Sequence, residues 1–378
     1  MIDSAIILAG GTGTRLWPAS TRESPKQFMD PGTGITLLGE AFHRAIAVGV
    51  QSEILVVTDA AHAEAVAAEA RKLGPDAPPV TVLAEPLGRN TAPAIAYAAA
   101  YLRSRDRMDE FSLVMAADHL IRPLEVFAAD VKRAESLAAE GFVVIFGIPP
   151  TRAETGYGYI EAGSQHDEGM LCASFREKPE KEIAERYAAS GNYYWNSGMF
   201  VFRNSVFCKE LLTYSPEVWE SFQNLPSDFV VEPLDGAGLV SPSAELQELY
   251  HELPKISIDY AVMESSKRAA MVDVRFDWTD LGSWDELAAL QREPVTPAEA
   301  ASAGSIGSGT TAANPAPLYT AESENNYVLS DMPVALCGVS DLIVVVKNGT
   351  VLICSKGESQ LVRDIVSKIE VDGREDLL

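Results

Sequence analysis

The sequence predicts an α/β fold, a doubly wound and mainly parallel sheet, followed by a small β module. Two observations predict it. In the first part of the chain, short runs that are apolar throughout alternate with longer alanine-rich stretches, which is typical of a parallel sheet covered by helices on both faces. After about residue 290 the composition changes and short β-rich segments follow. We expect an α/β domain over 1–293, a linker or long loop over 294–325 and a β-rich module over 326–378.

Composition narrows the functional class. The 378 residues are 47% hydrophobic, yet no apolar run approaches the roughly 20 residues of a membrane span, so we expect a soluble protein with no membrane partner. The first apolar run, Ala5 to Ala9, is shorter than the ~7–15 residues of a signal-peptide core, and four cysteines lack C-x-x-C spacing. Both features favour a cytoplasmic location. The net charge of −24 disfavours a nucleic-acid partner.

The α/β part has its expected elements in a regular order. The Ala5 to Ala9 run is the first strand, and a glycine-rich turn follows it. In such folds ligands bind at the carboxyl ends of the strands, so we expect the motifs found there to form one site. The further predicted strands are Ile54 to Val57, Val80 to Leu83, Ser112 to Ala116 and Phe142 to Gly147, and the predicted helices include Ala60 to Lys72 and Ala92 to Leu102.

The last part of the chain predicts a compact β module. Residues 294–325 are rich in Ala, Ser, Gly, Thr and Pro, which is typical of a linker or an exposed loop. The pair Asn348-Gly349 between apolar runs predicts a tight hairpin. The module is predicted to contain strands at Val334 to Leu336, Leu342 to Lys347 and Thr350 to Cys354, and a closing helix from Gln360 to Ile369.

The opening of the chain predicts a nucleoside triphosphate site. The first strand runs into the glycine-rich turn Gly10-Gly11-Thr12-Gly13, which brings backbone N–H groups close to a ligand. The cations Arg15 and Lys26 follow where phosphates need them. Two familiar phosphate-binding motifs are excluded. Leu16 stands where a dinucleotide fingerprint needs its third glycine. A P-loop needs its lysine directly after the last glycine, whereas here Gly13 is followed by Thr14 and the lysine is Lys26.

The remaining pattern, G-G-x-G-T-R-L-W-P followed by P-K-Q-F, resembles the sugar-nucleotide pyrophosphorylases, or nucleotidyltransferases. The variant with Trp17 and Gln27-Phe28 is most similar to the mannose-1-phosphate guanylyltransferase branch. The resemblance implies a Rossmann-like nucleotidyltransferase fold with a short, left-handed β-helix-like C-terminal part, and a homodimer is possible by analogy. It implies GMP transfer from GTP to α-D-mannose 1-phosphate, which gives GDP-mannose and pyrophosphate.

The resemblance also implies roles for the phosphate-binding residues. Gly10, Gly11 and Thr12 would wrap the ribose and phosphates of the nucleotide. Arg15 and Lys26 would meet the leaving pyrophosphate and the α-phosphate, where negative charge grows as the bond breaks. Because the attacking sugar phosphate is already anionic, such a site needs charge neutralisation and alignment rather than a general base.

A second motif, Glu85-Pro86-Leu87-Gly88-Arg89-Asn90-Thr91, is similar to the guanine-binding segment of the mannose branch. Proline and glycine predict a rigid turn, and Thr91 or Asn90 can cap the alanine-rich helix that follows. By resemblance, the base would be contacted by Glu85, Gly88 and Asn90.

Two aspartates are the candidate metal ligands. Asp118 follows a predicted strand, and Asp280 precedes a helix that Ser283 and Glu286 would cap as a box. Both match the metal-binding aspartates of the family, and Mg²⁺ prefers one or two carboxylates together with phosphates and water. The resemblance therefore implies Mg²⁺ bound by Asp118 and Asp280. His119 is interpreted as structural.

Three further motifs are candidates for sugar recognition. By resemblance, the sugar ring would be contacted by Gly158, Glu161 and Asn196, and the 1-phosphate by Lys178. Small glycines, a carboxylate and an amide are suited to hydroxyl groups in a tight pocket. Residues 258–264 also match the family, but the sequence assigns them no role beyond helix packing and indirect support.

Two alternatives stay open. One is a guanylyltransferase for another sugar 1-phosphate, such as a heptose 1-phosphate, or an enzyme with a changed base preference for dTTP or ATP. The other is a non-catalytic protein that senses sugar nucleotides. Such a sensor would be expected to lose its metal carboxylates or loop cations, whereas this chain keeps Arg15, Lys26, Asp118 and Asp280.

Overall fold

The computed structural model describes residues 1–11, 13–225, 229–290, 310–312 and 316–378. These residues form two compact units, each assembled from separate pieces of chain. The first contains Met1–Gly10, Leu38–Ala117 and Ile121–Trp278, and the second contains Gly11–Leu37, Asp118–Leu120 and Thr279–Leu378. Most of the predicted linker over 294–325 lies outside the described residues, so the domain boundaries stay a prediction.

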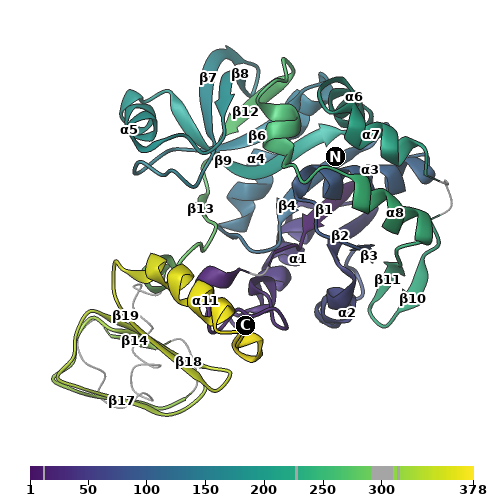
Figure 1. Cartoon of the computed structure of the whole chain (residues 1–378). Helices are drawn as coiled ribbons and strands as arrows, with labels where there is room; N and C mark the ends of the chain where they lie inside the picture. The colour runs from purple at the N-terminus through teal and green to yellow at the C-terminus, as the bar shows by residue number, and fades with distance from the viewer. Residues whose placement is uncertain (12, 226–228, 291–309, 313–315) are drawn as a thin grey trace. The chain divides into compact units, whose positions relative to one another are not determined.

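The first unit is built on a mixed sheet of 11 strands in the order β10-β11-β3-β2-β1-β4-β9-β6-β12-β8-β7 (Figure 1). The run from β11 to β4 is parallel, as is the pair β6–β12, and β9 lies antiparallel between β4 and β6. The strands are β1 (Ser4–Leu8), β2 (Glu53–Asp59), β3 (Val80–Glu85), β4 (Phe111–Ala116), β6 (Val143–Ile148), β7 (Tyr159–His166), β8 (Gly169–Arg176), β9 (Tyr193–Arg203), β10 (Glu232–Leu234), β11 (Ala237–Val240) and β12 (Ala269–Asp273). Two further short strands, β5 (Leu120–Arg122) and β13 (Asp277–Thr279), are where the chain passes from one unit to the other.

Helices cover both faces of this sheet, which confirms the doubly wound prediction. Adjacent residues of β6 point to opposite faces. Ile145 joins an apolar cluster with Phe207 of α6, whereas the ring of Phe146 lies 6.2 Å from that of Phe127 in α4. The helices are α1 (Leu37–Val48), α2 (Ala63–Ala70), α3 (Thr91–Ser104), α4 (Leu124–Ala139), α5 (Lys181–Ser190), α6 (Asn204–Tyr214), α7 (Pro216–Gln223) and α8 (Ala244–Glu252).

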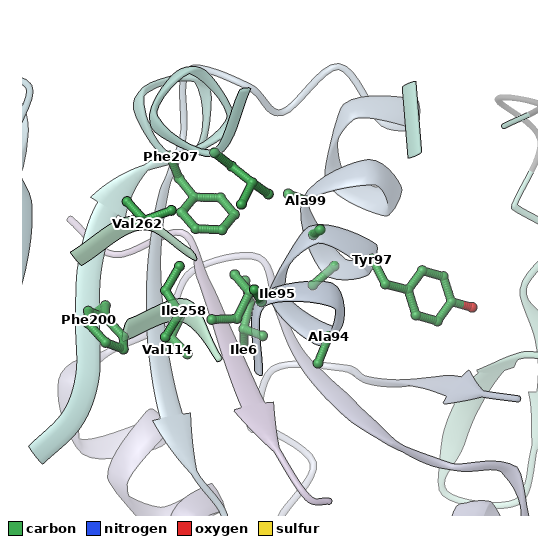
Figure 2. Close-up of a cluster of buried hydrophobic side chains, with 14 of the residues drawn as sticks. Ile6, Ala94, Ile95, Tyr97, Ala99, Val114, Phe200, Phe207, Ile258 and Val262 are labelled. Atoms are coloured by element: carbon green, nitrogen blue, oxygen red, sulfur yellow. The ribbon is translucent and has the colours of Figure 1, made fainter. Parts of the chain in front are cut away.

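The alanine-rich helix α3 lies at the centre of the larger core. Alanine favours helix and its small side chain allows close approach to the strands. Ile95 packs near Ile6 of β1 and Val114 of β4, as Figure 2 shows. The backbone that precedes α3 is therefore fixed by the core.

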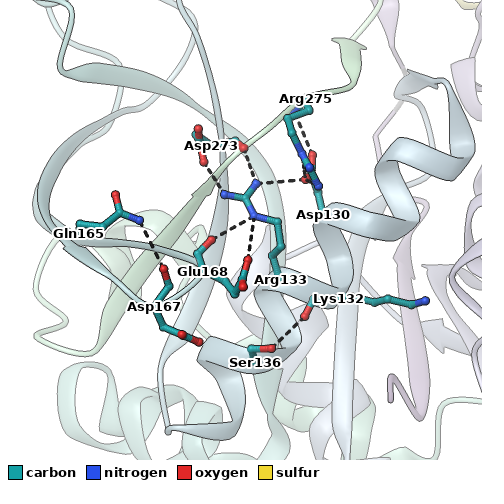
Figure 3. A network of polar contacts seen from close by, with 9 residues as sticks. All are labelled: Asp130, Lys132, Arg133, Ser136, Gln165, Asp167, Glu168, Asp273 and Arg275. Carbon is teal, nitrogen blue, oxygen red and sulfur yellow. Dashed lines mark hydrogen bonds and ion pairs between the residues drawn. The ribbon is translucent and has the colours of Figure 1, made fainter.

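A polar network joins α4 to β12 and the β7–β8 hairpin (Figure 3). Asp130 is fully buried and accepts hydrogen bonds from the backbone N–H and Nε of Arg275, at 2.8 and 2.7 Å. Arg133 donates to Asp130 Oδ1 at 3.1 Å and to Asp273 Oδ1 at 2.7 Å. It also donates to the carbonyl of Glu168 in the hairpin turn at 3.1 Å. Two arginines thus compensate the charge of the buried Asp130 carboxylate.

The second unit contains a β-helix-like coil, in agreement with the predicted β module. Thr311, Tyr327 and Ile343 are aligned in adjacent parallel strands, so each coil takes 16 residues. Asn348 and Gly349, with φ of 52° and 71°, form the predicted hairpin turn between β18 and β19. The strands are β14 (Thr311–Ala312), β15 (Leu318–Ala321), β16 (Tyr327–Ser330), β17 (Val334–Cys337), β18 (Leu342–Lys347) and β19 (Thr350–Ser355).

An apolar core joins the first and last pieces of the second unit. Trp17 and Trp284 lie in it with Val362 and Val366 of helix α11 (Val362–Val371). The Trp17 indole donates to the carbonyl of Leu377 at 2.7 Å, and the Trp284 indole, at the start of α9 (Trp284–Leu290), donates to the carbonyl of Trp17 at 3.0 Å. The glycine-rich loop is therefore packed against the C-terminal part of the chain. Among the described residues, no helix has the length and hydrophobicity needed to cross a membrane.

Candidate active site

Lys26 lies between the two predicted metal ligands of the second unit. It begins the short helix η2 (Lys26–Phe28), and its side chain is only 7% exposed. Its Nζ donates to Asp118 Oδ2 at 2.7 Å and to the backbone carbonyl of Asp280 at 2.5 Å. The ammonium therefore joins three segments that are far apart in the sequence, and it brings both aspartates to one place.

The Asp118 carboxylate is held in its charged form. Burial by itself would raise its pKa, but the Lys26 ammonium and the buried His119 beside it lower the pKa to about 2. Asp118 comes two residues after the end of β4. The site therefore offers an ionised, hard oxygen ligand at neutral pH.

Gly13 allows the close approach that places Lys26. Its φ is +64°, in the left-handed region, and a Cβ at this position would lie 2.4 Å from Cβ of Lys26. It also precedes the short helix η1 (Thr14–Leu16), which carries Arg15. A side chain at residue 13 would thus disturb the positions of both cations.

Arg15 and the Asp280 carboxylate meet at Gly282. A Cβ at Gly282 would lie 3.1 Å from one terminal nitrogen of Arg15 and 3.2 Å from Asp280 Oδ2. The turn is set locally: Leu281 has φ of +45°, and its N–H donates to Thr279 Oγ1 at 3.0 Å. The four residues predicted to be catalytic therefore all lie within the second unit, around this turn and Lys26.

The predicted capping box of α9 forms in part. The N–H of Glu286 donates to Ser283 Oγ at 3.3 Å, as expected. The Glu286 carboxylate instead accepts the N–H of Gly282 at 2.6 Å. This bond fixes the backbone two residues after Asp280, so the cap also supports the site.

The remaining residues of the opening motif are placed differently. Gly10 and Gly11 are exposed, and a Cβ at either would meet nothing within 4 Å; Gly11 has φ of +97°. Thr12 lies outside the described residues. Arg22, from the same loop, faces the C-terminal part of the chain, with Glu370 at 3.6 Å and Glu375 at 3.8 Å.

In the first unit, residues 85–91, here called the base loop, run from the last residue of β3 to the first residue of α3. Glu85 is buried and accepts a hydrogen bond from the Tyr250 hydroxyl at 3.1 Å. Burial raises its pKa to about 7, with a smaller contribution from the charge of Asp59. Gly88 is exposed, and the Asn90 side chain caps α3 by accepting the N–H of Thr91 at 2.8 Å. The assignment of Glu85, Gly88 and Asn90 to base contact stays a prediction.

Two of the predicted sugar residues, Gly158 and Lys178, lie against a glutamate that the sequence did not single out. Glu177 pairs with Lys178, Nζ to Oε1, at 2.8 Å, and its side chain is 6% exposed. A Cβ at Gly158 would lie 2.4 Å from Glu177 Oε2. That oxygen is thus a buried acceptor with no hydrogen-bond partner among the residues that the structure describes.

Asn196 is oriented by a second acid that the sequence left without a role. Its Nδ2 donates to Asp259 Oδ1 at 2.7 Å, and its Oδ1 accepts the N–H of Gly198 at 2.9 Å. Burial and then the charge of Glu177 raise the pKa of Asp259 to about 6. The Asn196 cluster, as we call it, consists of Gly158, Glu177, Lys178 and Asn196, and Asp259 contacts it from another segment.

Glu161 has partners other than this cluster in the described contacts. It lies on β7 and accepts a hydrogen bond from Ser174 at 2.8 Å. Burial and the charge of Glu161 raise the pKa of Tyr193 to about 12. Its assignment to the sugar ring stays a prediction, as do those of Gly158, Lys178 and Asn196.

Two matches to known families cover most of the chain. The nucleotidyl transferase family matches residues 4–294, and the MannoseP isomerase/GMP-like beta-helix domain matches residues 320–369. The first agrees with the doubly wound sheet, and the second agrees with the 16-residue coils.

Named relatives are similar over nearly the whole chain. A mannose-1-phosphate guanylyltransferase 2 of Escherichia coli O157:H7 is 35% identical over 98% of this chain and 74% of its own length. A mannose-1-phosphate guanylyltransferase of Klebsiella pneumoniae is 38% identical over 98% and 74%. A crystal structure from Thermus thermophilus, described as a mannose-1-phosphate geranyltransferase, aligns with a TM-score of 0.80 and 31% identity over 98% of this chain and 100% of that one. With this extent of similarity, the chain belongs to the nucleotidyl transferase family.

Proposed function

We propose that this protein transfers GMP from GTP to mannose 1-phosphate, giving GDP-mannose and pyrophosphate. The central support from the structure is the Lys26 ammonium, held between Asp118 and Asp280 with Arg15 beside the same turn. The relatives named mannose-1-phosphate guanylyltransferases support the choice of substrates.

The reaction is an in-line displacement at phosphorus. An oxygen of the sugar 1-phosphate attacks the α-phosphorus of GTP, and the bond from that phosphorus to the oxygen bridging to the β-phosphorus breaks, so pyrophosphate leaves with the electron pair. The protein's contribution is alignment and charge compensation. Lys26 and Arg15 are suited to the negative charge that grows on the phosphates, and the fixed position of Lys26 reduces the cost of reorganisation.

The residues of the second unit fit a divalent cation. Nucleotidyltransferases of this family generally use divalent metals. No group of three or more His, Cys, Asp or Glu side chains able to hold a metal ion occurs among the described residues. Two aspartates, one of them ionised down to about pH 2, suit Mg²⁺, whose other ligands are usually phosphates and water. We propose that Asp118 and Asp280 hold Mg²⁺, which neutralises phosphate charge when bound.

The substrates are assigned to the two sets of residues as follows. We propose that the nucleotide binds to Gly10, Gly11, Thr12, Glu85, Gly88 and Asn90. We propose that the sugar 1-phosphate binds to Gly158, Glu161, Lys178 and Asn196. Lys178 has φ of +44°, and its side chain is 58% exposed, so its ammonium is accessible to a phosphate. We also propose a cytoplasmic location and a homodimer, the latter testable by light scattering.

The test is a substrate panel. Purified protein is incubated with GTP, ATP or dTTP, with mannose or heptose 1-phosphate, and with Mg²⁺, and pyrophosphate release is measured. GTP with mannose 1-phosphate is expected to give the highest kcat/KM. Turnover with ATP or dTTP and none with GTP would overturn the base assignment, and turnover with the heptose alone would overturn the sugar assignment.

Two variants test the aspartates. Asp118→Asn and Asp280→Asn are each expected to lower kcat by about 100-fold or more, since each removes a charge from the reacting centre. Asp235→Asn, at an exposed residue paired with Arg71, is the matched control. Unchanged turnover in both site variants contradicts the ligand assignment. A different outcome concerns the wild-type protein: if it binds both substrates but releases no pyrophosphate, it is a sensor and not an enzyme.

A further inference from the structure

One segment of the first unit contacts both the base loop and the Asn196 cluster. It comprises residues 250–264, from the end of α8 to just beyond the short helix η4 (Asp259–Met263), and we call it the strap. Ile258 and Val262 of the strap are buried in the same apolar cluster as Ile95 of α3 (Figure 2). The strap is thus anchored in the core between its two sets of polar contacts.

The first set of contacts is with Glu85 and Arg89. Arg89 donates from Nε to the carbonyl of Tyr250 at 2.6 Å and from a terminal nitrogen to the carbonyl of His251 at 2.8 Å. These carbonyls lie in the last turn of α8, where a cation is favourable. The Tyr250 hydroxyl donates to Glu85 at the other end of the base loop. Side chains from both ends of the loop are therefore tied to the same turn.

Backbone bonds then align the strap with the end of the base loop. The N–H of Ile256 donates to the carbonyl of Arg89 at 3.2 Å, and the N–H of Ala92 donates to the carbonyl of Ile256 at 3.2 Å. The N–H of Ile258 donates to Thr91 Oγ1 at 2.9 Å. Thr91 therefore fixes the strap one residue before Asp259.

The second set of contacts is with the Asn196 cluster. Asp259 accepts the Asn196 amide, and Glu264 Oε1 accepts the N–H of Glu177 at 3.0 Å. These two acids are five residues apart and are joined by a π-type bond, in which the N–H of Glu264 donates to the carbonyl of Asp259 at 3.0 Å. Single π turns occur often at functional sites. Here the wide turn lets both acids contact the same cluster.

Asp259 helps to fix the orientation of the Asn196 amide. One Nδ2 hydrogen and one acceptor direction of Oδ1 are already used by Asp259 and by the N–H of Gly198. A single N–H and a single lone pair are left for a ligand. Without Asp259, only the N–H of Gly198 holds the amide in this orientation.

We propose that the strap couples the base loop to the Asn196 cluster, with Asp259 and Thr91 as positioning residues, so that a change at one end alters binding at the other. This inference rests on the proposed function for its kinetic consequence. Its structural content is independent of that function, because the contacts that carry it lie within the first unit.

The decisive variant is Thr91→Val, which keeps the shape of the side chain and removes the acceptor for the N–H of Ile258. It is expected to raise KM for mannose 1-phosphate as well as for GTP, by about 3- to 10-fold each, the equivalent of roughly one lost hydrogen bond. Thr91→Ser is expected to restore both values. Thr213→Val, the same change on an exposed face of α6, is the matched control.

A double-mutant cycle tests the coupling itself. Asp259→Ala removes a contact to Asn196, in the proposed sugar site, yet it is expected to raise KM for GTP as well. Asp259→Asn keeps the acceptor oxygen, so it is expected to restore the wild-type KM. If the strap couples the two ends, Thr91→Val and Asp259→Ala together cost less than the product of their separate effects. Multiplicative effects, each confined to one substrate, overturn the proposal.

Hydrogen exchange separates this proposal from the proposed function. Without ligand, Thr91→Val is expected to speed amide exchange in peptides that contain Glu177 and Asn196, and Thr213→Val is expected to leave them unchanged. Exchange that changes only around residues 85–92 refutes the strap even in an active enzyme. If the wild-type protein shows no GTP turnover but the distant amides respond, the proposed function is wrong and the coupling stands.

Discussion

At the scale of single residues, two glycines of the second unit leave space for charged side chains. Gly13 lies against Lys26, and Gly282 lies between Arg15 and the Asp280 carboxylate. Neither position tolerates a side chain without displacement of a functional group. The sequence predicted the glycine-rich turn and its cations, but not that Gly282 would share their surroundings, because that depends on contacts between distant segments.

Gly13→Ala tests this arrangement. The left-handed backbone and the 2.4 Å approach to Lys26 Cβ are expected to lower stability by about 1–3 kcal/mol and to lower kcat by moving the ammonium. Gly10→Ala, where a Cβ meets nothing within 4 Å, is the control for stability. Thermal unfolding and pyrophosphate release measure the two effects. Equal stability of the two variants would falsify the steric argument.

Glu85 gives a prediction for pH. Its folded pKa of about 7 lies above the ordinary 4.5, so the folded state holds a proton that the unfolded chain loses first. Its contribution to stability is therefore complete below about pH 4.5 and is lost as the pH rises to about 7. Glu85→Gln keeps an acceptor for Tyr250 and cannot ionise.

The variant is thus expected to become more stable relative to wild type between pH 5 and pH 8, by at most about 3 kcal/mol. Denaturant unfolding at both pH values measures this difference. Glu252→Gln, at an exposed position, is the control. A difference that stays constant with pH contradicts the raised pKa.

At the scale of elements, the sequence predicted β1, β2, β3, β4, β6 and α3 to within two residues, because each carries its own apolar or alanine-rich pattern. It did not predict β9. The first half of that strand contains Asn196, Ser197 and Gly198, which interrupt the apolar run, and its pairing with β4 and β6 comes from the sheet. Nor did it predict the π turn: at 100° per residue, Asp259 and Glu264 would lie about 140° apart on an α-helix.

The network around Asp130 is predicted to stabilise the packing of α4 against β12. Asp130→Ala is expected to lower the free energy of unfolding by about 3–5 kcal/mol, because Arg133 and Arg275 lose the buried charge that they share. Chemical denaturation measures the loss. Ser136→Ala, at an exposed position further along α4, is expected to change stability by less than about 0.5 kcal/mol. Equal effects of the two changes would contradict the network's importance.

At the scale of the whole molecule, each of the two units is assembled from segments that are far apart in the sequence. The loop with Arg15 and Lys26 belongs to the unit of the C-terminal coils, and Asp118 joins it from the middle of the sequence. Periodicity is a local signal, so it predicted the sheet and the β-rich segments of the C-terminal module but not this assembly. The predicted catalytic residues are brought together by long-range packing around Trp17 and Trp284.

This packing predicts an effect of the C-terminal helix on catalysis. Val366→Asp places a carboxylate in the core that holds Trp17, and is expected to lower pyrophosphate release and shift tryptophan fluorescence to the red. Val371→Asp, in the same helix at a residue 87% exposed, is expected to change neither. Normal turnover in Val366→Asp means that the loop holds its position without α11.

The bond from Trp17 to the carbonyl of Leu377 spans 360 positions of the chain. During translation the strands of the sheet leave the ribosome in order and can begin to fold, since domains generally fold as they emerge. The loop that carries the cations cannot gain this packing until α11 and Leu377 have been synthesised. In a nascent chain the strands of the sheet are therefore available before the packing that positions Lys26.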